Sequence, residues 1–186
     1  MTDAVVTLKK GEGRYLQKGG PWIYDNEIAD ISPGAEDGGL VRVCGENGWP
    51  LGQGFLNRRS KLTVRMLTRD PDAEINEDFF LMRLKNAWEY RKKVVDTSSC
   101  RLVFGEADFL PGLVVDKFSD VLVVESLALG IDRLKSTILS LLVDLLKEDG
   151  ISVRGIYERS DAKVRLKEGM ERVKGFLSDP FDPVVE

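Results

Sequence analysis

The chain changes character near residue 70. Up to that point short apolar runs are cut by glycine-containing turns, as at 32–34, 37–39 and 46–48, and five strands are predicted at 5–9, 27–31, 40–44, 51–57 and 62–68. Only a brief helical segment, 15–18, interrupts them. Short strands at this spacing are typical of a small β-barrel. The stretch 69–76 loses apolar periodicity and contains Pro71, so we predict two domains, 1–72 and 73–186.

The second domain begins with a long predicted helix over residues 77–95. Asn76 is suited to be its N-cap, and Glu77 and Asp78 place negative charge in its first turn. A second helix is predicted at 132–148, ended by Gly150. Strands are predicted before it at 101–105, 112–118 and 121–126, and after it at 155–159 and 172–177. Strands, helix, strands is an α+β pattern, not a doubly wound sheet.

The amino-acid composition excludes several kinds of catalytic and metal site. The 186 residues include no histidine, which excludes Ser-His-Asp and Cys-His triads and the commonest metal ligand, and we expect no metal site. Cys44 and Cys100 form no CxxC pair, so no disulfide framework is predicted. The longest apolar stretch, 138–146, contains Ser140 and Asp144, and no signal-peptide core is visible. A cytoplasmic location without membrane contact is therefore expected.

Charge is distributed unevenly along the chain. The net charge is -4, but residues 1–69 contain ten Lys and Arg against eight Asp and Glu, whereas 70–186 contain 17 against 23. Five of the basic residues lie between 57 and 69, where there is no acidic residue: Arg58, Arg59, Lys61, Arg65 and Arg69. A strand with one positive, solvated face binds phosphates without sequence preference. The alternative is a strand that is merely solvated.

Two glycine pairs suggest a dinucleotide-binding loop but do not complete one. Gly11 with Gly13 and Gly52 with Gly54 have Leu16 and Asn57 where the third glycine would stand. We interpret both pairs as turns or a bulge. The sequence contains no GxxxxGK[ST] motif either.

The segment 105–116 has the highest density of polar residues within an apolar context. Leu110, Pro111 and Gly112 suit a type II turn, which would display Glu106 and Asp108 near the tip of a hairpin. In one interpretation these two carboxylates and Asp116 form an acid/base pair or a metal site. In the other they cap turns or lie in solvent at the edge of the sheet. The residues alone favour the second interpretation, because no pocket that would shift their pKa values can be inferred.

Several motifs together resemble a known family. They are KGGPWIY (18–24), GQGFLN (52–57) with Ser60, Val64 and Arg65, RLVFGEADFLPGLVVD (101–116), and YERSD (157–161) with Arg165, Glu168 and Gly169. The chain resembles the bacterial class I S-adenosylmethionine-dependent methyltransferases that modify C5 of cytosine in large-subunit ribosomal RNA. The motif positions we single out are Arg101, Glu106, Asp108, Pro111, Gly112, Asp116, Glu158 and Arg159. The chain departs from the family pattern at Gly20, Cys100 and Phe109.

The resemblance implies a domain architecture and a role for each domain. In that family an RNA-binding PUA pseudobarrel and a central α+β domain precede a Rossmann-like methyltransferase domain. We expect this chain to match the first two parts only, ending before the cofactor motif and the catalytic cysteine. It would then contain no catalytic residue and hold no cofactor, since S-adenosylmethionine belongs to the complete enzyme. The motifs add Lys18 and Trp22 to the basic residues Arg58, Arg59, Lys61 and Arg65 as expected RNA contacts.

The sequence therefore supports three hypotheses. In the first, the chain is the substrate-positioning portion of such a methyltransferase, binds 23S-type ribosomal RNA and is inactive alone. In the second, it is a scaffold or homodimerisation module that binds no RNA. In the third, it is a small hydrolase that uses Glu106, Asp108 and Asp116.

Overall fold

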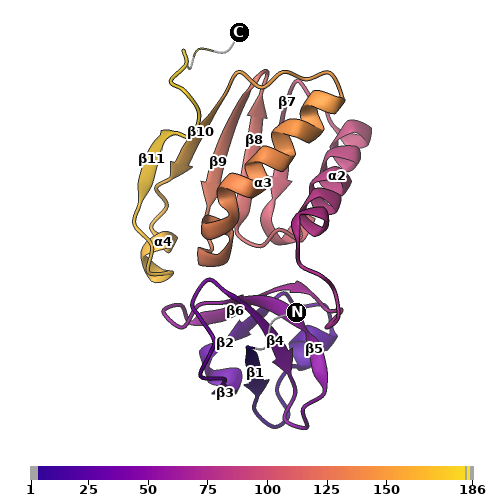
Figure 1. The fold of residues 1–186 in the computed structure, drawn as a ribbon, viewed down its shortest axis with the longest axis vertical. Coiled ribbons are helices and arrows are strands. Elements are labelled where there is room, and N and C mark those ends of the chain that lie inside the picture. The colour runs from indigo at the N-terminus through magenta and orange to yellow at the C-terminus, as the bar shows by residue number, and fades with distance from the viewer. Residues whose placement is uncertain (1–3, 183, 185–186) are drawn as a thin grey trace.

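The protein consists of two β-sheet units joined by a short connection (Figure 1). We describe a computed structural model, which covers residues 4–182 and 184. No helix among these residues is both long and apolar enough to cross a membrane. The fold is α+β, as the sequence predicts.

The first unit is a six-stranded sheet with strand order β2-β6-β5-β4-β1-β3. Its strands are β1 (Val5–Leu8), β2 (Trp22–Tyr24), β3 (Ile28–Ile31), β4 (Leu40–Cys44), β5 (Pro50–Leu56) and β6 (Leu62–Thr68). Helix α1 (Arg14–Gln17) and the 3-10 turn η1 (Asp25–Glu27) lie between them. Strand β1 runs parallel to β4, and the other pairs are antiparallel.

The sheet forms a half-barrel, where the strand pattern predicts a compact barrel. Strands β2 and β3 are the two edges of the sheet, and no ladder joins them in the part of the chain that the structure describes. Their connection is η1, three residues long. The sequence analysis missed β2, because three residues are too few to show an alternating pattern.

The second unit is a five-stranded sheet with strand order β11-β10-β9-β8-β7. Its strands are β7 (Ser99–Phe104), β8 (Leu113–Phe118), β9 (Val121–Ser126), β10 (Gly155–Ser160) and β11 (Val173–Phe176). Helices α2 (Glu77–Val94) and α3 (Leu129–Glu148) lie on one face of this sheet, as Figure 1 shows. The short helix α4 (Val164–Lys167) lies at the end of the unit that faces the first sheet.

The helix ends follow local chemistry. Asn76 caps α2, since its Oδ1 accepts a hydrogen bond from the Phe79 N–H at 3.0 Å. Helix α3 ends at Glu148, and Gly150, two residues later, has a φ of 78° that favours glycine. At its other end α3 begins at Leu129, three residues before the predicted start, and Ala128 offers no side-chain cap. This start is fixed by packing, because Ile131 of the first turn is fully buried.

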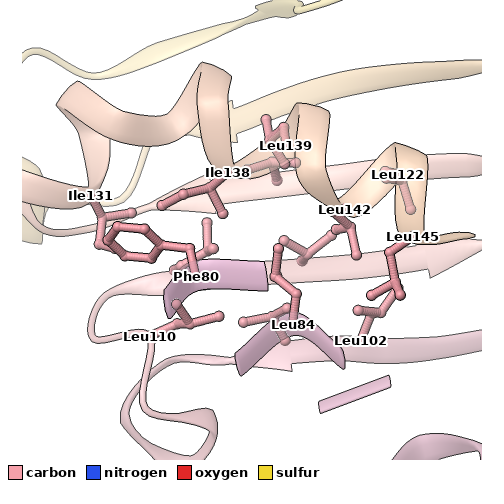
Figure 2. Close-up of a cluster of buried hydrophobic side chains, with 14 of the residues drawn as sticks. Phe80, Leu84, Leu102, Leu110, Leu122, Ile131, Ile138, Leu139, Leu142 and Leu145 are labelled. Carbon is pink, nitrogen blue, oxygen red and sulfur yellow. The ribbon is translucent and has the colours of Figure 1, made fainter. Parts of the chain in front are cut away.

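The main hydrophobic core lies between the two long helices and the second sheet (Figure 2). Ile131, Ile138 and Leu142 of α3 face Phe80 and Leu84 of α2 across this layer. The first unit has its own smaller core, built from Val6, Leu8, Leu16, Ile23, Ala35, Val41, Val43, Leu56, Val64 and Met66. Phe55 and Leu67 belong to β5 and β6 but pack into the main core, so the two units share apolar packing.

Candidate nucleic-acid interface

A buried carboxylate joins the two units. Glu168 follows α4, is 2% exposed, and accepts hydrogen bonds from groups of the first unit. Its Oε1 accepts from Ser60 Oγ at 2.6 Å and from Arg65 at 3.1 Å, and its Oε2 accepts from the Asn57 amide at 3.1 Å. The same amide also donates to the Glu168 carbonyl at 2.9 Å. A buried charge with this many donors is fully compensated.

Glu106 makes the second polar connection between the units. Its Oε1 accepts from the Trp22 indole N–H at 2.8 Å and from Arg65 at 3.1 Å. Trp22 and Arg65 are neighbours across the β2–β6 ladder, so both side chains reach the carboxylate from one place on the first sheet. We call the contact formed by Asn57, Ser60, Arg65, Glu106 and Glu168 the joint.

Three glycines allow the units to approach closely. A Cβ added at Gly130, in the first turn of α3, would lie 2.2 Å from Cγ of Phe55. One at Gly169 would lie 2.4 Å from Cδ of Arg59, and one at Gly38 would lie 2.7 Å from Nε of Arg133. Each glycine therefore touches a side chain of the other unit. At Gly130 the neighbour is the buried ring of Phe55, whereas the exposed arginines beside Gly169 and Gly38 could move aside.

A groove lined by arginines crosses the surface next to the joint. Its walls come from both units: Glu36, Asp37, Arg58, Arg59, Leu129, Arg133 and Gly169. We call it the arginine groove. Asp37 accepts from the Arg58 backbone N–H at 2.8 Å and from its Nε at 3.0 Å. Burial acts to raise the pKa of Asp37, but the hydrogen bonds and charge of Arg58 outweigh it and hold that pKa below its ordinary value.

The other two arginines of the groove keep their charges available. Neither the Arg59 nor the Arg133 guanidinium forms an ion pair with a carboxylate in residues 4–182 and 184. Both residues are exposed. Three arginines thus face two carboxylates, of which Asp37 already neutralises Arg58. The arrangement offers two unpaired guanidinium groups from different units, which suits phosphate oxygens.

The six residues expected to contact RNA lie in different environments. Arg58 and Arg59 line the arginine groove, and Lys61 is exposed in the same β5–β6 connection. Lys18 is exposed after α1. In contrast, Trp22 and Arg65 donate to carboxylates at the joint, and the Arg65 side chain is only 12% exposed.

The sequence analysis missed Arg133 as a groove residue. It lies on α3, 74 positions beyond Arg59, and an arginine on the charged face of a helix gives no local signal of its surroundings. The Arg133 side chain lies beside the first unit through a tertiary contact with Gly38, which the sequence does not show.

The hairpin carboxylates are engaged by basic side chains, and Asp108 also caps the turn as the second interpretation expects. Asp108 accepts from both terminal nitrogens of Arg91, at 2.5 and 2.6 Å, and from the Phe104 N–H at 2.6 Å. Asp116 accepts from Arg101 at 2.8 and 3.1 Å. The turn itself forms as expected: the Leu113 N–H donates to the Leu110 carbonyl at 3.0 Å, Gly112 has a φ of 81°, and Pro111 and Gly112 are buried.

The remaining motif positions lie on β10. Glu158 is 5% exposed and accepts from Lys135 of α3 at 2.6 Å. Arg159 points to the opposite side and is exposed, 3.8 Å from Asp161. No group of three or more histidine, cysteine or acidic side chains is placed to hold a metal ion within the described residues. Burial raises the pKa of both the Cys44 and the Cys100 thiol.

Neither glycine pair fits a nucleotide cofactor. A Cβ at Gly52 would lie 2.1 Å from the Thr68 carbonyl oxygen, and one at Gly54 would lie 2.4 Å from that of Arg65. These glycines serve close pairing of β5 with β6, so the chain itself fills the space a cofactor would need. Gly13 likewise faces Leu8 and Leu51. The residues present therefore do not fit S-adenosylmethionine at either pair.

Residues 6–69 match the family described as PUA-like domain. The chain is 34% identical to ribosomal RNA large subunit methyltransferase I of Alteromonas mediterranea, over 94% of this chain and 43% of that protein. The proteins of the same name from Pseudoalteromonas translucida and Shewanella frigidimarina are each 35% identical, over 100% and 97% of this chain. The chain spans less than half the length of these relatives, 43–46%.

Solved structures share the fold at low sequence identity. A Streptococcus mutans protein described as an S-adenosylmethionine-dependent methyltransferase superposes with a TM-score of 0.74 and 15% identity, covering 96% of this chain and 44% of its own. A methyltransferase complexed with S-adenosylhomocysteine, SMU.776, superposes with a TM-score of 0.73 and 16% identity, covering 96% and 43%.

Proposed function

We propose that this chain is the RNA-binding and substrate-positioning portion of a large-subunit ribosomal RNA cytosine-C5 methyltransferase. The match of residues 6–69 to PUA-like domains and the names of the relatives support the RNA-directed role. We place the boundary between the two domains at residues 72 and 73, and the cytoplasmic location expected from the sequence belongs to the same proposal. By this account the chain is inactive alone.

The arginine groove is the observation that carries the proposal. Arg59 comes from the first unit and Arg133 from the second, and both charges are unpaired among the described residues. Contacts to phosphate fix the register and orientation of a nucleic acid without reading its sequence. The joint holds the two arginines in one arrangement, so a strand that contacts both is held in a defined direction relative to both units.

In the complete enzyme this chain would act through position. S-adenosylmethionine, bound outside these residues, supplies the methyl group. Holding the RNA backbone on the arginine groove raises the effective concentration of the target base at the reacting groups. Lys61 and Lys18 are both exposed and available for further phosphate contacts. Trp22 and Arg65 contribute indirectly, because their bonds to Glu106 keep the first unit in place.

Neutralising the groove tests this assignment. We expect Arg59→Gln with Arg133→Gln to weaken RNA binding and to reduce the slope of log affinity against log salt by about one for each phosphate that the variant no longer binds. The control is Lys147→Gln, which removes an exposed charge at the far end of α3. The measurement is fluorescence anisotropy with a labelled ribosomal RNA hairpin. Unchanged affinity and slope in the double variant would remove the groove from the proposal.

The outer face of the second sheet favours a second candidate, self-association without RNA binding. Phe104, Phe118 and Phe176 are 51%, 45% and 41% exposed. Exposed aromatic side chains on one unit are a common feature of protein interfaces. Sedimentation equilibrium decides between the two: a dimer that binds no RNA supports the scaffold, whereas a monomer that binds RNA rejects it.

A further inference from the structure

A second cleft opens on the other side of the joint, between α1, β6 and the turn that precedes β8. Its volume is about 270 Å³, and its lining includes Gly19, Gly20, Arg69, Arg83, Phe109 and the carboxylate Glu106, which Trp22 and Arg65 already bind. We call it the Phe109 cleft. Ligand pockets for whole small molecules typically measure ~300–1,000 Å³. The Phe109 cleft is therefore sized for a single planar ring system.

Phe109 is displayed in an unusual way. Its side chain is 67% exposed, and its φ of 59° lies in the left-handed region that favours glycine. A bulky aromatic residue in this conformation is strained, and such strain persists where the surrounding structure imposes it. Here the fold fixes the backbone, since the Phe109 N–H donates to the Glu106 carbonyl at 3.1 Å.

Arg83 of α2 contacts both the backbone and the ring of Phe109. Its guanidinium donates to the Phe109 carbonyl and, at 2.7 Å, to the Leu67 carbonyl of β6. The same group lies 5.5 Å from the Phe109 ring centroid and 4.2 Å from that of Phe79. Its Nε is buried without a partner among the described atoms, and burial lowers the pKa of Arg83 to about 10, so the group is charged at neutral pH. A cation thus lies by the aromatic ring, which remains two-thirds exposed.

The opposite wall of the cleft is bare backbone. A Cβ at Gly20 would lie 2.1 Å from the ring of Tyr15, so no side chain can stand there. Gly19 has a φ of 106°, and a Cβ added to it would lie 3.5 Å from a terminal nitrogen of the Arg69 guanidinium. Lys18 precedes these glycines and is exposed. The cleft therefore combines a flat aromatic ring, an open wall and the exposed basic side chain of Arg69.

We propose that the Phe109 cleft binds one unstacked base of a single-stranded RNA segment, with the base against the Phe109 ring and an adjoining phosphate at Arg69. The inference rests on the proposed function and adds a base contact to its phosphate contacts. Stacking on an aromatic ring tolerates any base, because every base has a π-face. Together with the arginine groove, the cleft would hold RNA on both sides of the joint.

The test compares two RNAs and two proteins. One RNA is a short labelled single strand, and the other is the same strand made of abasic nucleotides. We expect the wild-type chain to bind the first about 5- to 150-fold more tightly, the range for stacking one base on an aromatic side chain. The variant Phe109→Gly should bind both RNAs alike, because the ring is gone.

Phe109→Gly also separates loss of binding from loss of folding. Glycine is favoured at a φ of 59°, so we expect the variant to be at least as stable as the wild type in urea. Phe109→Tyr should keep the preference for the RNA that has bases. Phe104→Ala, which removes another exposed phenylalanine, should change neither affinity.

The outcomes distinguish this inference from the function on which it rests. A wild-type chain that binds both RNAs equally overturns the stacking site and leaves phosphate binding by the arginine groove intact. A chain that binds neither RNA overturns the proposed function as well. A Phe109→Gly variant that keeps its RNA affinities but loses self-association would show that the ring contacts a second copy, which also overturns the inference.

Discussion

At the scale of single residues, Glu168 determines how the two units are held together. It is a carboxylate taken out of water and surrounded by the donors of Asn57, Ser60 and Arg65. The net gain from such a group is small, because desolvation offsets attraction, but removing one partner leaves the others uncompensated. The four residues thus behave as a unit that is intact or broken.

Glu168→Gln tests this view. The substitution leaves Arg65 with its side chain 12% exposed and short of one carboxylate, so we expect the free energy of unfolding to fall by about 3 kcal/mol. The measurement is urea unfolding at neutral pH. Glu171→Gln, an exposed glutamate nearby, should stay within about 0.5 kcal/mol of the wild type. A loss as small in Glu168→Gln as in the control would contradict the role given to the joint.

Asp132 makes stability depend on pH. Burial acts to raise its pKa, but hydrogen bonds and charges from Arg165 and Lys135 outweigh burial and hold that pKa below the ordinary value of 3.8. A lowered pKa means that the ionised form stabilises the fold above pH 3.8 and that this stabilisation is lost as the pH falls below it. We expect Asp132→Asn to destabilise the protein at pH 7 and progressively less below about pH 4. Unfolding curves at both pH values check this, and a difference that grows on acidification would show the sign to be wrong.

The sequence alone could not show which basic side chains face the groove and which form buried ion pairs. Arg58, Arg59 and Arg65 lie in one short run, yet two line the groove and the third lies between Glu106 and Glu168. The run shows where positive charge is concentrated. It cannot show which arginine meets a carboxylate from a segment 41 or 103 residues away.

At the scale of elements, the strands and helices with several turns or several alternating residues could be predicted from the sequence. The long helix expected at 77–95 is found at Glu77–Val94, and the strand expected at 121–126 has those bounds. Two short pieces were not predicted: β2 and α4 have three and four residues and take their shape from tertiary contacts. Tertiary contacts also explain the early start of α3. Gly130 lowers helix propensity there, but the Phe55 ring packs so closely that only glycine fits.

Gly130→Ala separates these two effects. In an exposed helix the change would stabilise by about 1 kcal/mol. Here the added Cβ would lie 2.2 Å from Cγ of Phe55, a buried ring that cannot move aside easily, so we expect the free energy of unfolding to decrease. In a Phe55→Ala background the same change should be neutral or stabilising. Denaturant unfolding of the four proteins gives the comparison, and a stabilising Gly130→Ala in the wild-type background would mean that the two units do not meet at this point.

At the scale of the whole molecule, the shared core and the joint predict that the two units unfold together. Phe55 and Leu67 of the first sheet pack with Phe80 of α2, and Glu168 binds across the same boundary. The amides of β4 report on the first unit and those of α3 on the second, so hydrogen exchange in rising urea should give coincident transitions. Two separate midpoints would show that each unit folds by itself and that the joint contributes little.

The most direct test of the RNA-binding account is the affinity of this chain for large-subunit ribosomal RNA fragments across a range of salt concentrations, with a scrambled hairpin as control. Phosphate contacts release counterions, so we expect tight binding at low salt that weakens linearly on a log–log plot, with a slope of about 0.7 to 0.9 for each phosphate bound. A preference for the ribosomal fragments would place recognition in this chain. Absence of binding at low salt would contradict the account.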